Sequence, residues 1–100
     1  MRTLALSTLR TFWEGGHASA EAPLRDWYIK TERMQWSGFG ELRSTFASAD
    51  QVGNKVVFNI GGNNFRLIAA VNYPFGRVLV RWIGTHAEYD RLTKKEIERL

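Results

Sequence analysis

The chain has 100 residues, a net charge of +4, 44% hydrophobic residues, 13% aromatic residues and no cysteine. This length provides one small core and not two, and the hydrophobic content excludes a disordered chain, so we expect one folded domain over residues 1–100. The lack of cysteine excludes disulfide bonds and thiolate metal sites. No run approaches the roughly 20 apolar residues of a membrane span, and residues 1–7 lack the apolar core of a signal peptide, so we expect a cytoplasmic protein without membrane contacts.

The excess positive charge lies in the second half of the chain. Residues 1–50 carry six basic and six acidic side chains, whereas residues 51–100 carry eight basic and four acidic ones. The stretch from Gln51 to Thr85 contains no acidic residue and four basic ones, Lys55, Arg66, Arg77 and Arg81. A segment of one sign inside a folded domain suggests a polyanionic partner, with nucleic acid as the leading candidate. Ordinary solvated surface charge gives the same pattern, so charge alone leaves both interpretations open.

The first half of the chain is predicted to be helical, after a short strand over residues 2–6. Ser7 can cap a helix that continues to about Glu14, where two glycines end it. A second helix is expected from Pro23, a favoured first-turn residue, with apolar residues at helical spacing after it. A short helical segment through Leu42 and Phe46 follows.

The second half is predicted to form an antiparallel meander. Three β-branched and aromatic segments are expected as strands, Lys55–Ile60, Phe65–Asn72 and Arg77–Gly84. Residues 61–64 and 73–76 between them carry strong turn signals. Such a sheet can pack one face on helices and leave the other face in water.

Strict alternation along these strands sorts their side chains into two faces. The purely apolar set is expected against the helices; it contains Val56, Phe58, Ile60, Phe65, Leu67, Ala69, Val71, Val78, Val80 and Trp82. The opposite face then carries Lys55, Asn59, Arg66, Arg77 and Arg81. We therefore expect an exposed basic face that can seat an RNA backbone, and we expect Arg66 to contribute little to stability.

Two short helices are predicted after the sheet. Thr85 and Glu88 have the spacing of a capping box, and Thr93 and Glu96 repeat it. These boxes predict helices over 87–92 and from residue 94 onward. His86 then lies at the rim of the sheet, next to a helix N-terminus.

Two motifs in order resemble those of HigB-type toxins. Residues 57–68 read VFNIGGNNFRLI, similar to an FNI-x-GN-x-x-RLI signature, and residues 84–90 read GTHAEYD, similar to the THAEYD motif. The chain differs from many family members in Asn64, often Lys, and Phe65, often Tyr. The resemblance implies an α+β, RelE-like fold, with N-terminal helices packed on a mainly antiparallel sheet of three or four strands and a short C-terminal helix. It also implies the toxin of a type II toxin–antitoxin pair, with a HigA-like helix-turn-helix antitoxin, mRNA and the ribosome as partners.

The chemistry of RNA cleavage suggests which side chains matter. Attack by the ribose 2′-OH needs proton transfer at two oxygens and stabilisation of negative charge on phosphorus. No spacing of His and carboxylates indicates a metal site, so we expect no cofactor. The predicted catalytic residues are Arg66, His86, Arg81 and Tyr89, and the predicted RNA-binding residues are Lys55, Asn59, Asn63 and Arg77.

Each of these residues also has a structural interpretation. The arginines and Lys55 can be exposed strand residues, and His86 can hold the strand–helix junction. Tyr89 can pack on the core, and Asn63 is favoured in a turn for its backbone conformation alone. His17, in a polar loop, is expected to be solvated and inert.

The sequence is compatible with three classes of function. The leading hypothesis is an endoribonuclease that cleaves mRNA by 2′-OH attack, and the alternative is a non-catalytic RNA- or ribosome-binding module on the same scaffold. A protein-interaction domain would not need the acid-free basic segment. The antitoxin is expected to cover the basic face or to brace the helices.

Overall fold

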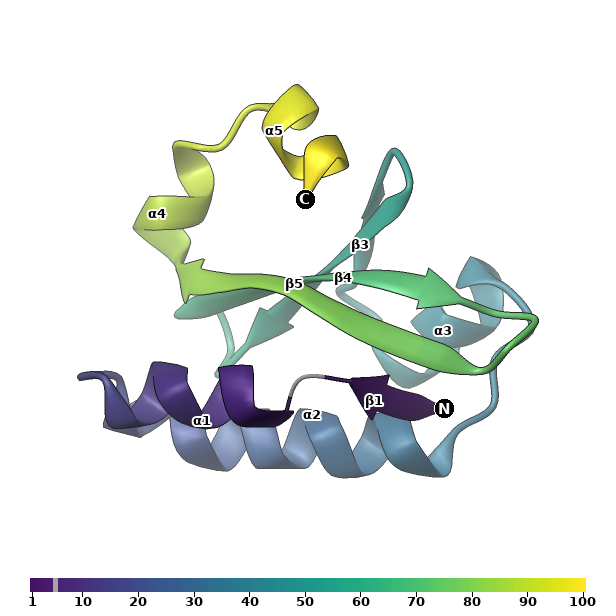
Figure 1. Cartoon of the computed structure of the whole chain (residues 1–100), viewed down its shortest axis with the longest axis horizontal. Coiled ribbons are helices and arrows are strands. Elements are labelled where there is room, and N and C mark those ends of the chain that lie inside the picture. Colours follow the sequence, from purple (N-terminus) through teal and green to yellow (C-terminus); the bar gives the residue numbers. More distant parts are fainter. Residues whose placement is uncertain (5) are drawn as a thin grey trace.

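The computed structural model describes residues 1–4 and 6–100 and has three layers (Figure 1). The helices α1 and α2 lie on one face of a central sheet, and α4 and α5 lie on the other. In chain order the elements are β1 (Arg2–Leu4), α1 (Leu6–Glu14), a 3₁₀ turn η1 (Ala18–Ala20), α2 (Glu21–Arg33), α3 (Phe39–Thr45), β2 (Asp50–Val52), β3 (Lys55–Ile60), β4 (Phe65–Asn72), β5 (Arg77–Thr85), α4 (His86–Asp90) and α5 (Lys94–Arg99). The predicted α+β class is confirmed.

The sheet has five strands in the order β1-β5-β4-β3-β2, one more than the upper expectation. The predicted meander β3-β4-β5 is antiparallel as expected. The extra strand is β2, whose polar sequence Asp50–Val52 carries no strand signal but pairs with β3. β1 adds at the other edge, parallel to β5, and Ala5 of the predicted first strand lies outside the described residues.

The turn between β3 and β4 depends on glycine. Gly61 and Gly62 have φ angles of 63° and 68°, in the left-handed region that other residues rarely adopt. This conformation reverses the chain within a few residues and brings Phe65 opposite Ile60. The hairpin that carries Arg66 is thereby placed in register.

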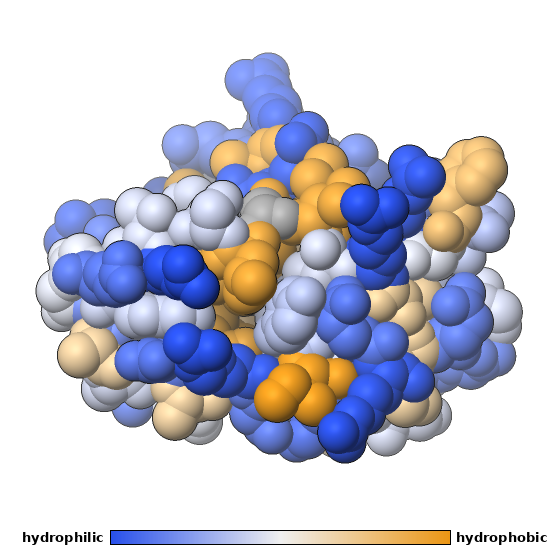
Figure 2. Space-filling view, turned by 60° about the horizontal axis from the view of Figure 1, so that its bottom comes forward, coloured by the Kyte–Doolittle hydropathy of each residue, from blue (hydrophilic) through white to orange (hydrophobic). Residues whose placement is uncertain are grey.

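The main core lies between the sheet and the N-terminal helices. The alternating apolar residues of β3, β4 and β5 are buried there with Leu9, Leu24 and Trp27 of the helices. The Trp27 ring meets the Phe58 ring edge-on, with 5.4 Å between centroids. Figure 2 shows the molecule from the side of α1 and α2, where hydrophilic side chains surround separate hydrophobic patches. The helices therefore turn their apolar stripes inward, as the helical spacing predicted.

A bulge in β5 overturns one part of the predicted alternation. Ile68 is opposite Trp82, but the next residue of β4, Ala69, is opposite Val80. Arg81 is the extra residue, so the side chains of β5 change face at this point. Trp82 consequently packs on the C-terminal side, and its predicted place against the N-terminal helices is wrong.

The second face of the sheet is partly covered, and not open as predicted. Val57 and Ile68 form a small second core with Ile97 of α5, joined by Trp82 and Tyr89. Two cations of this face are buried as well: Lys55 is 4% exposed and Arg66 is 8% exposed. Both predicted capping boxes are present, and they begin α4 and α5 at the expected positions to within one residue. Among the described helices, none is long and apolar enough to cross a membrane.

The burial pattern predicts very different costs for two phenylalanines. Phe58 is 1% exposed at the centre of the main core, whereas Phe75 is 74% exposed in the turn after β4. We expect Phe58→Ala to lower the free energy of unfolding by about 3–5 kcal/mol, because it leaves a cavity. Phe75→Ala is the matched control and should change stability by less than about 0.5 kcal/mol. Denaturant unfolding of the two variants checks this, and equal losses would contradict the assigned core.

Candidate functional site

The candidate site lies where the β3–β4 turn meets the junction of β5 and α4. The backbone N–H of His86 donates to the carbonyl oxygen of Asn64, with 3.0 Å between N and O. Thr85 caps α4 by accepting from the backbone N–H of Glu88 at 3.1 Å, and the Glu88 carboxylate accepts from the Thr85 N–H at 2.8 Å. These bonds hold the turn and the short helix α4 together, so the residues of both predicted motifs meet at one end of the sheet.

Arg66 is a fixed part of this site. Its guanidinium donates to the side-chain oxygen of Asn63 at 2.5 Å and to the carbonyl oxygens of Phe65 and Asn63 at 3.1 and 3.4 Å. The guanidinium carbon lies 5.9 Å from the centre of the Tyr89 ring. The expectation of an exposed strand arginine is wrong, because Arg66 is buried against the turn and α4. Asn63 has a defined structural task here, which is to hold the guanidinium.

Tyr89 connects this arginine to the second core. Its ring is half-buried and lies 6.4 Å, centre to centre, from the ring of Trp82. Burial raises the pKa of the Tyr89 phenol, Asp50 and Asp90 raise it further, and Arg66 opposes the increase. The raised pKa extends the neutral form of the hydroxyl further into alkaline solution, and the neutral hydroxyl can donate a hydrogen bond to a phosphate or a base.

His86 and Asp90 form a pair along α4. The His86 Nδ1 lies 2.9 Å from the Asp90 Oδ2, and the His86 side chain is 39% exposed. In a neutral imidazole whose Nδ1–H faces a carboxylate, Nε2 is the acceptor. The pair thus fixes the ring and leaves Nε2 as the nitrogen for proton exchange with a substrate.

The other predicted cations are spread along the sheet. Arg81 is exposed at the β5 bulge. Because Val80 and Ile83 both pack in the main core, the bulge directs Arg81 and Trp82 to the face that carries α4. Arg77 is exposed at the far end of β5, away from His86.

Lys55 and Asn59 lie on the predicted face of the sheet, but Lys55 is not exposed there. The Lys55 Nζ donates to the Asn54 side chain at 3.0 Å and to the Glu98 carbonyl oxygen at 2.9 Å, so it ties α5 to β3. Its expected exposure at the site is wrong, since α5 covers it. Asn59 is the register partner of Arg66, but it also borders a hollow shared with Trp27 of the helix layer.

Three residues near the site have roles that the sequence pattern does not reveal. Asp90 is the last residue of α4, and its spacing of four from His86 is the signal of a pair on one helix face. Asp50 lies close enough to raise the Tyr89 pKa, and no local pattern indicates this proximity because β2 carries no strand signal. His17 is half-buried and stacks on Phe12 with 4.1 Å between ring centres, so it is not the solvated residue expected.

The described part of the chain contains no group of three or more His, Asp or Glu side chains that could hold a metal ion. The site instead combines a guanidinium, a phenol and a histidine–carboxylate pair. Such groups can stabilise charge on a phosphate and exchange protons with it.

Two comparisons with known proteins bear on the family of this chain. Residues 20–92 match the family described as HigB_toxin, the RelE-like toxic component of a toxin-antitoxin system. The chain belongs to the HigB toxin family. A relative from Escherichia coli O6:H1, the mRNA interferase HigB, is 44% identical over 74 residues, which cover 71% of this chain and 72% of the relative. The mRNA interferase toxin HigB of Escherichia coli K12 is 36% identical over 55 residues, 52% of this chain and 53% of that protein. The matched family region contains both motifs that suggested a HigB-type toxin, and this identification is confirmed.

The raised pKa of Tyr89 predicts a pH dependence of stability in this HigB family member. Because the folded-state pKa lies above the unfolded value, the stabilisation is complete below the ordinary tyrosine pKa of 10.0 and is lost as pH rises through the folded-state pKa. We expect Tyr89→Phe to reduce the loss of stability in alkaline solution, leaving the part due to Tyr73, whose pKa burial also raises. Thermal melts of both proteins between neutral and alkaline pH measure the difference, and identical pH profiles would contradict the assigned burial of the phenol.

Proposed function

We propose that this HigB toxin is an endoribonuclease that cleaves mRNA without a metal ion, by attack of the 2′-OH on the adjacent phosphate. The observation that carries the proposal is the grouping of Arg66, Tyr89 and the His86–Asp90 pair at one end of the sheet. The similarity to proteins named mRNA interferases supports RNA as the substrate.

The reaction assigned to this site is a transesterification. The 2′-oxygen forms a bond to phosphorus and loses its proton, while the bond from phosphorus to the 5′-oxygen breaks and that oxygen gains a proton. The products are a 2′,3′-cyclic phosphate and a 5′-hydroxyl. A positioned acid or base contributes typically 10²–10⁴-fold to such steps.

His86 is proposed to carry one of the two proton transfers through Nε2. Asp90 acts as a positioning residue, because it holds the opposite nitrogen at 2.9 Å. Tyr89 donates a hydrogen bond to a phosphate oxygen or a base, and Arg66 supplies positive charge next to it. Arg81, exposed on the same face, binds the RNA backbone or the charged transition state.

The proposed partners follow from the family. A toxin of a toxin–antitoxin system implies an antitoxin, and we propose a HigA-like helix-turn-helix protein in that role. We further propose that the toxin acts in the cytoplasm on mRNA bound to the ribosome. The exposed Arg81 and Arg77 provide charge that either partner can cover.

One observation favours an alternative, a non-catalytic RNA- or ribosome-binding module. Arg66 is buried, and its guanidinium N–H groups donate to oxygens of Asn63 and Phe65, so fewer N–H groups remain for a phosphate. In that case the same face would bind RNA and leave it intact. Mapping new 3′ ends in RNA incubated with the protein, with and without translating ribosomes, separates the two functions.

Catalysis by His86 predicts a clear pattern among variants. We expect His86→Ala to lower kcat by about 10²–10⁴-fold because a proton-transfer group is removed. Asp90→Asn should lower kcat by a smaller factor with little change in KM, since it leaves the imidazole in place but no longer fixed by a carboxylate. Cleavage by the parent protein should persist in the presence of a metal chelator.

Arg10→Ala is the matched control for these variants, because Arg10 is an exposed cation on α1 in the opposite layer. Arg66→Ala is a poor test, since removal of a buried, hydrogen-bonded guanidinium also destabilises the turn. Thermal melts accompany each assay. A folded His86→Ala protein that cleaves at the parent rate would overturn the assignment.

A toxin of this family should arrest growth when it is produced alone. We expect the arrest to be relieved by co-production of the cognate antitoxin, which blocks cleavage, and also by His86→Ala, which slows it. Growth curves, with protein levels measured on immunoblots, check this expectation. Arrest that persists at full strength in the His86→Ala strain would point to the binding module instead.

A further inference from the structure

We propose a second RNA-binding subsite at the other end of the face, where Arg2 and Arg77 bind one phosphate and an adjoining groove receives a neighbouring nucleoside. Arg2 of β1 and Arg77 of β5 are register partners in a parallel pair, and both are exposed. Like charges directly opposite each other destabilise a sheet. An anion bound between the two guanidinium groups would remove that repulsion, and a phosphate suits their bidentate geometry.

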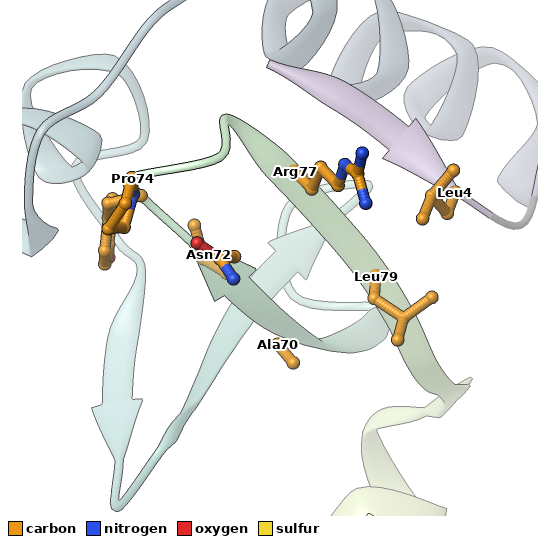
Figure 3. Close-up of a pocket in the computed structure, with 8 residues that line it drawn as sticks. Leu4, Ala70, Asn72, Pro74, Arg77 and Leu79 are labelled. Carbon is orange, nitrogen blue, oxygen red and sulfur yellow. The ribbon is translucent and has the colours of Figure 1, made fainter.

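Arg77 lines an open groove of about 520 Å³ (Figure 3), and Arg2 is its register partner on β1. Leu4 and Leu79, also register partners, provide an apolar wall together with Ala70. Arg77 extends from β5 toward β1 and Leu4, as Figure 3 shows. The volume is within the range of sites that bind small organic groups, and the apolar surface suits the flat face of a base.

The polar groups at the rim fit a nucleotide. The Asn72 side-chain oxygen accepts from the Phe75 N–H at 3.1 Å, so its NH₂ group is left to donate to a base edge. The groove lining contains no acidic residue. Among the ion pairs of residues 1–4 and 6–100, none includes Arg2, Arg77 or Arg81. A polyanion with planar apolar groups therefore matches this surface better than an apolar peptide does.

The subsite is continuous with the candidate catalytic site. Arg77 and Arg81 lie on the same face of β5, and β5 leads to Thr85 and His86. The span from Arg77 to Thr85 is about 26 Å of extended strand. A single-stranded RNA that follows β5 would thus place one phosphate near His86 and a distant one between Arg2 and Arg77. The inference rests on the proposed function, since it assigns part of the same substrate.

The test measures binding separately from cleavage. The probes are two fluorescently labelled RNAs of about 4 and about 12 nucleotides, lengths within the range of single-strand binding sites. Both carry 2′-O-methyl groups, so that they cannot be cleaved. We expect the double variant R2E/R77E to bind the longer RNA at least about tenfold more weakly, because a charge-assisted hydrogen bond is removed. The log–log salt dependence should become shallower by about 0.7 for each phosphate that the variant no longer neutralises. Binding of the short RNA should not change.

Arg10→Glu is the charge-matched control in the helix layer and should bind both RNAs like the parent. The milder Arg77→Gln variant covers the case in which R2E/R77E does not fold. Arg77→Gln removes the repulsion between Arg2 and Arg77 without reversing the charge, so thermal melts should show no loss of stability. Its affinity for the longer RNA should still fall.

Several outcomes overturn the proposal. Equal affinities and salt slopes of parent and variants for the longer RNA would show that no phosphate binds there. Loss of antitoxin binding by R2E/R77E with unchanged RNA binding would assign the groove to the antitoxin. A parent protein that binds neither RNA refutes the subsite, whereas the proposed function is tested separately by mapping new 3′ ends with and without translating ribosomes. If R2E/R77E weakens binding of the longer RNA alone, but the parent cleaves no unmodified RNA with or without ribosomes, the catalytic proposal fails and the subsite stands.

Discussion

A single extra residue in β5 determines how the second face of this protein is built. The bulge at Arg81 turns Trp82 away from the N-terminal helices and toward Ile68 and Tyr89. With Val57 and Ile97, these side chains form the small core that fixes α4 and α5 to the sheet. The phenol of Tyr89 consequently lies next to Arg66, and the start of α4 meets the β3–β4 turn. Without the bulge, strict alternation would point Trp82 toward the N-terminal helices.

The site depends on this second core for its rigidity. α4 is only five residues long and has no buried residue of its own, so its position comes from the groups that surround it. The capping box and the bond from His86 to Asn64 hold its start. The packing of Tyr89 on Trp82 holds its middle. Catalytic groups need positions accurate to a fraction of an ångström, and the contacts around α4 are the ones that would fix the proposed groups.

The sequence predicts the elements of this fold better than it predicts the exposure of the site. Periodicity and capping boxes locate the helices and the meander, because local patterns determine both. The bulge has no local signal, and it reverses the side-chain alternation that predicts the placement of Trp82. The cover over Lys55 depends on how α5 docks, a contact between residues 43 positions apart. The site motifs correctly indicate which residues meet, but not that Arg66 is buried or that Asp90 faces His86.

Burial of Lys55 and Arg66 does not remove the positive character of this face. The hydrogen-bond acceptors of both side chains are neutral: backbone carbonyls and the amides of Asn54 and Asn63. A neutral acceptor satisfies the donors of a cation without cancelling its charge, whereas a carboxylate would cancel it. Water screens a buried charge less than an exposed one, so its field would reach an anion on this face more strongly. The basic face therefore combines fixed inner cations with exposed outer ones, Arg81, Arg77 and Arg2. Of the inner pair, Arg66 places charge beside Tyr89 and Lys55 places it under α5, while the outer set is the one proposed to bind the RNA backbone.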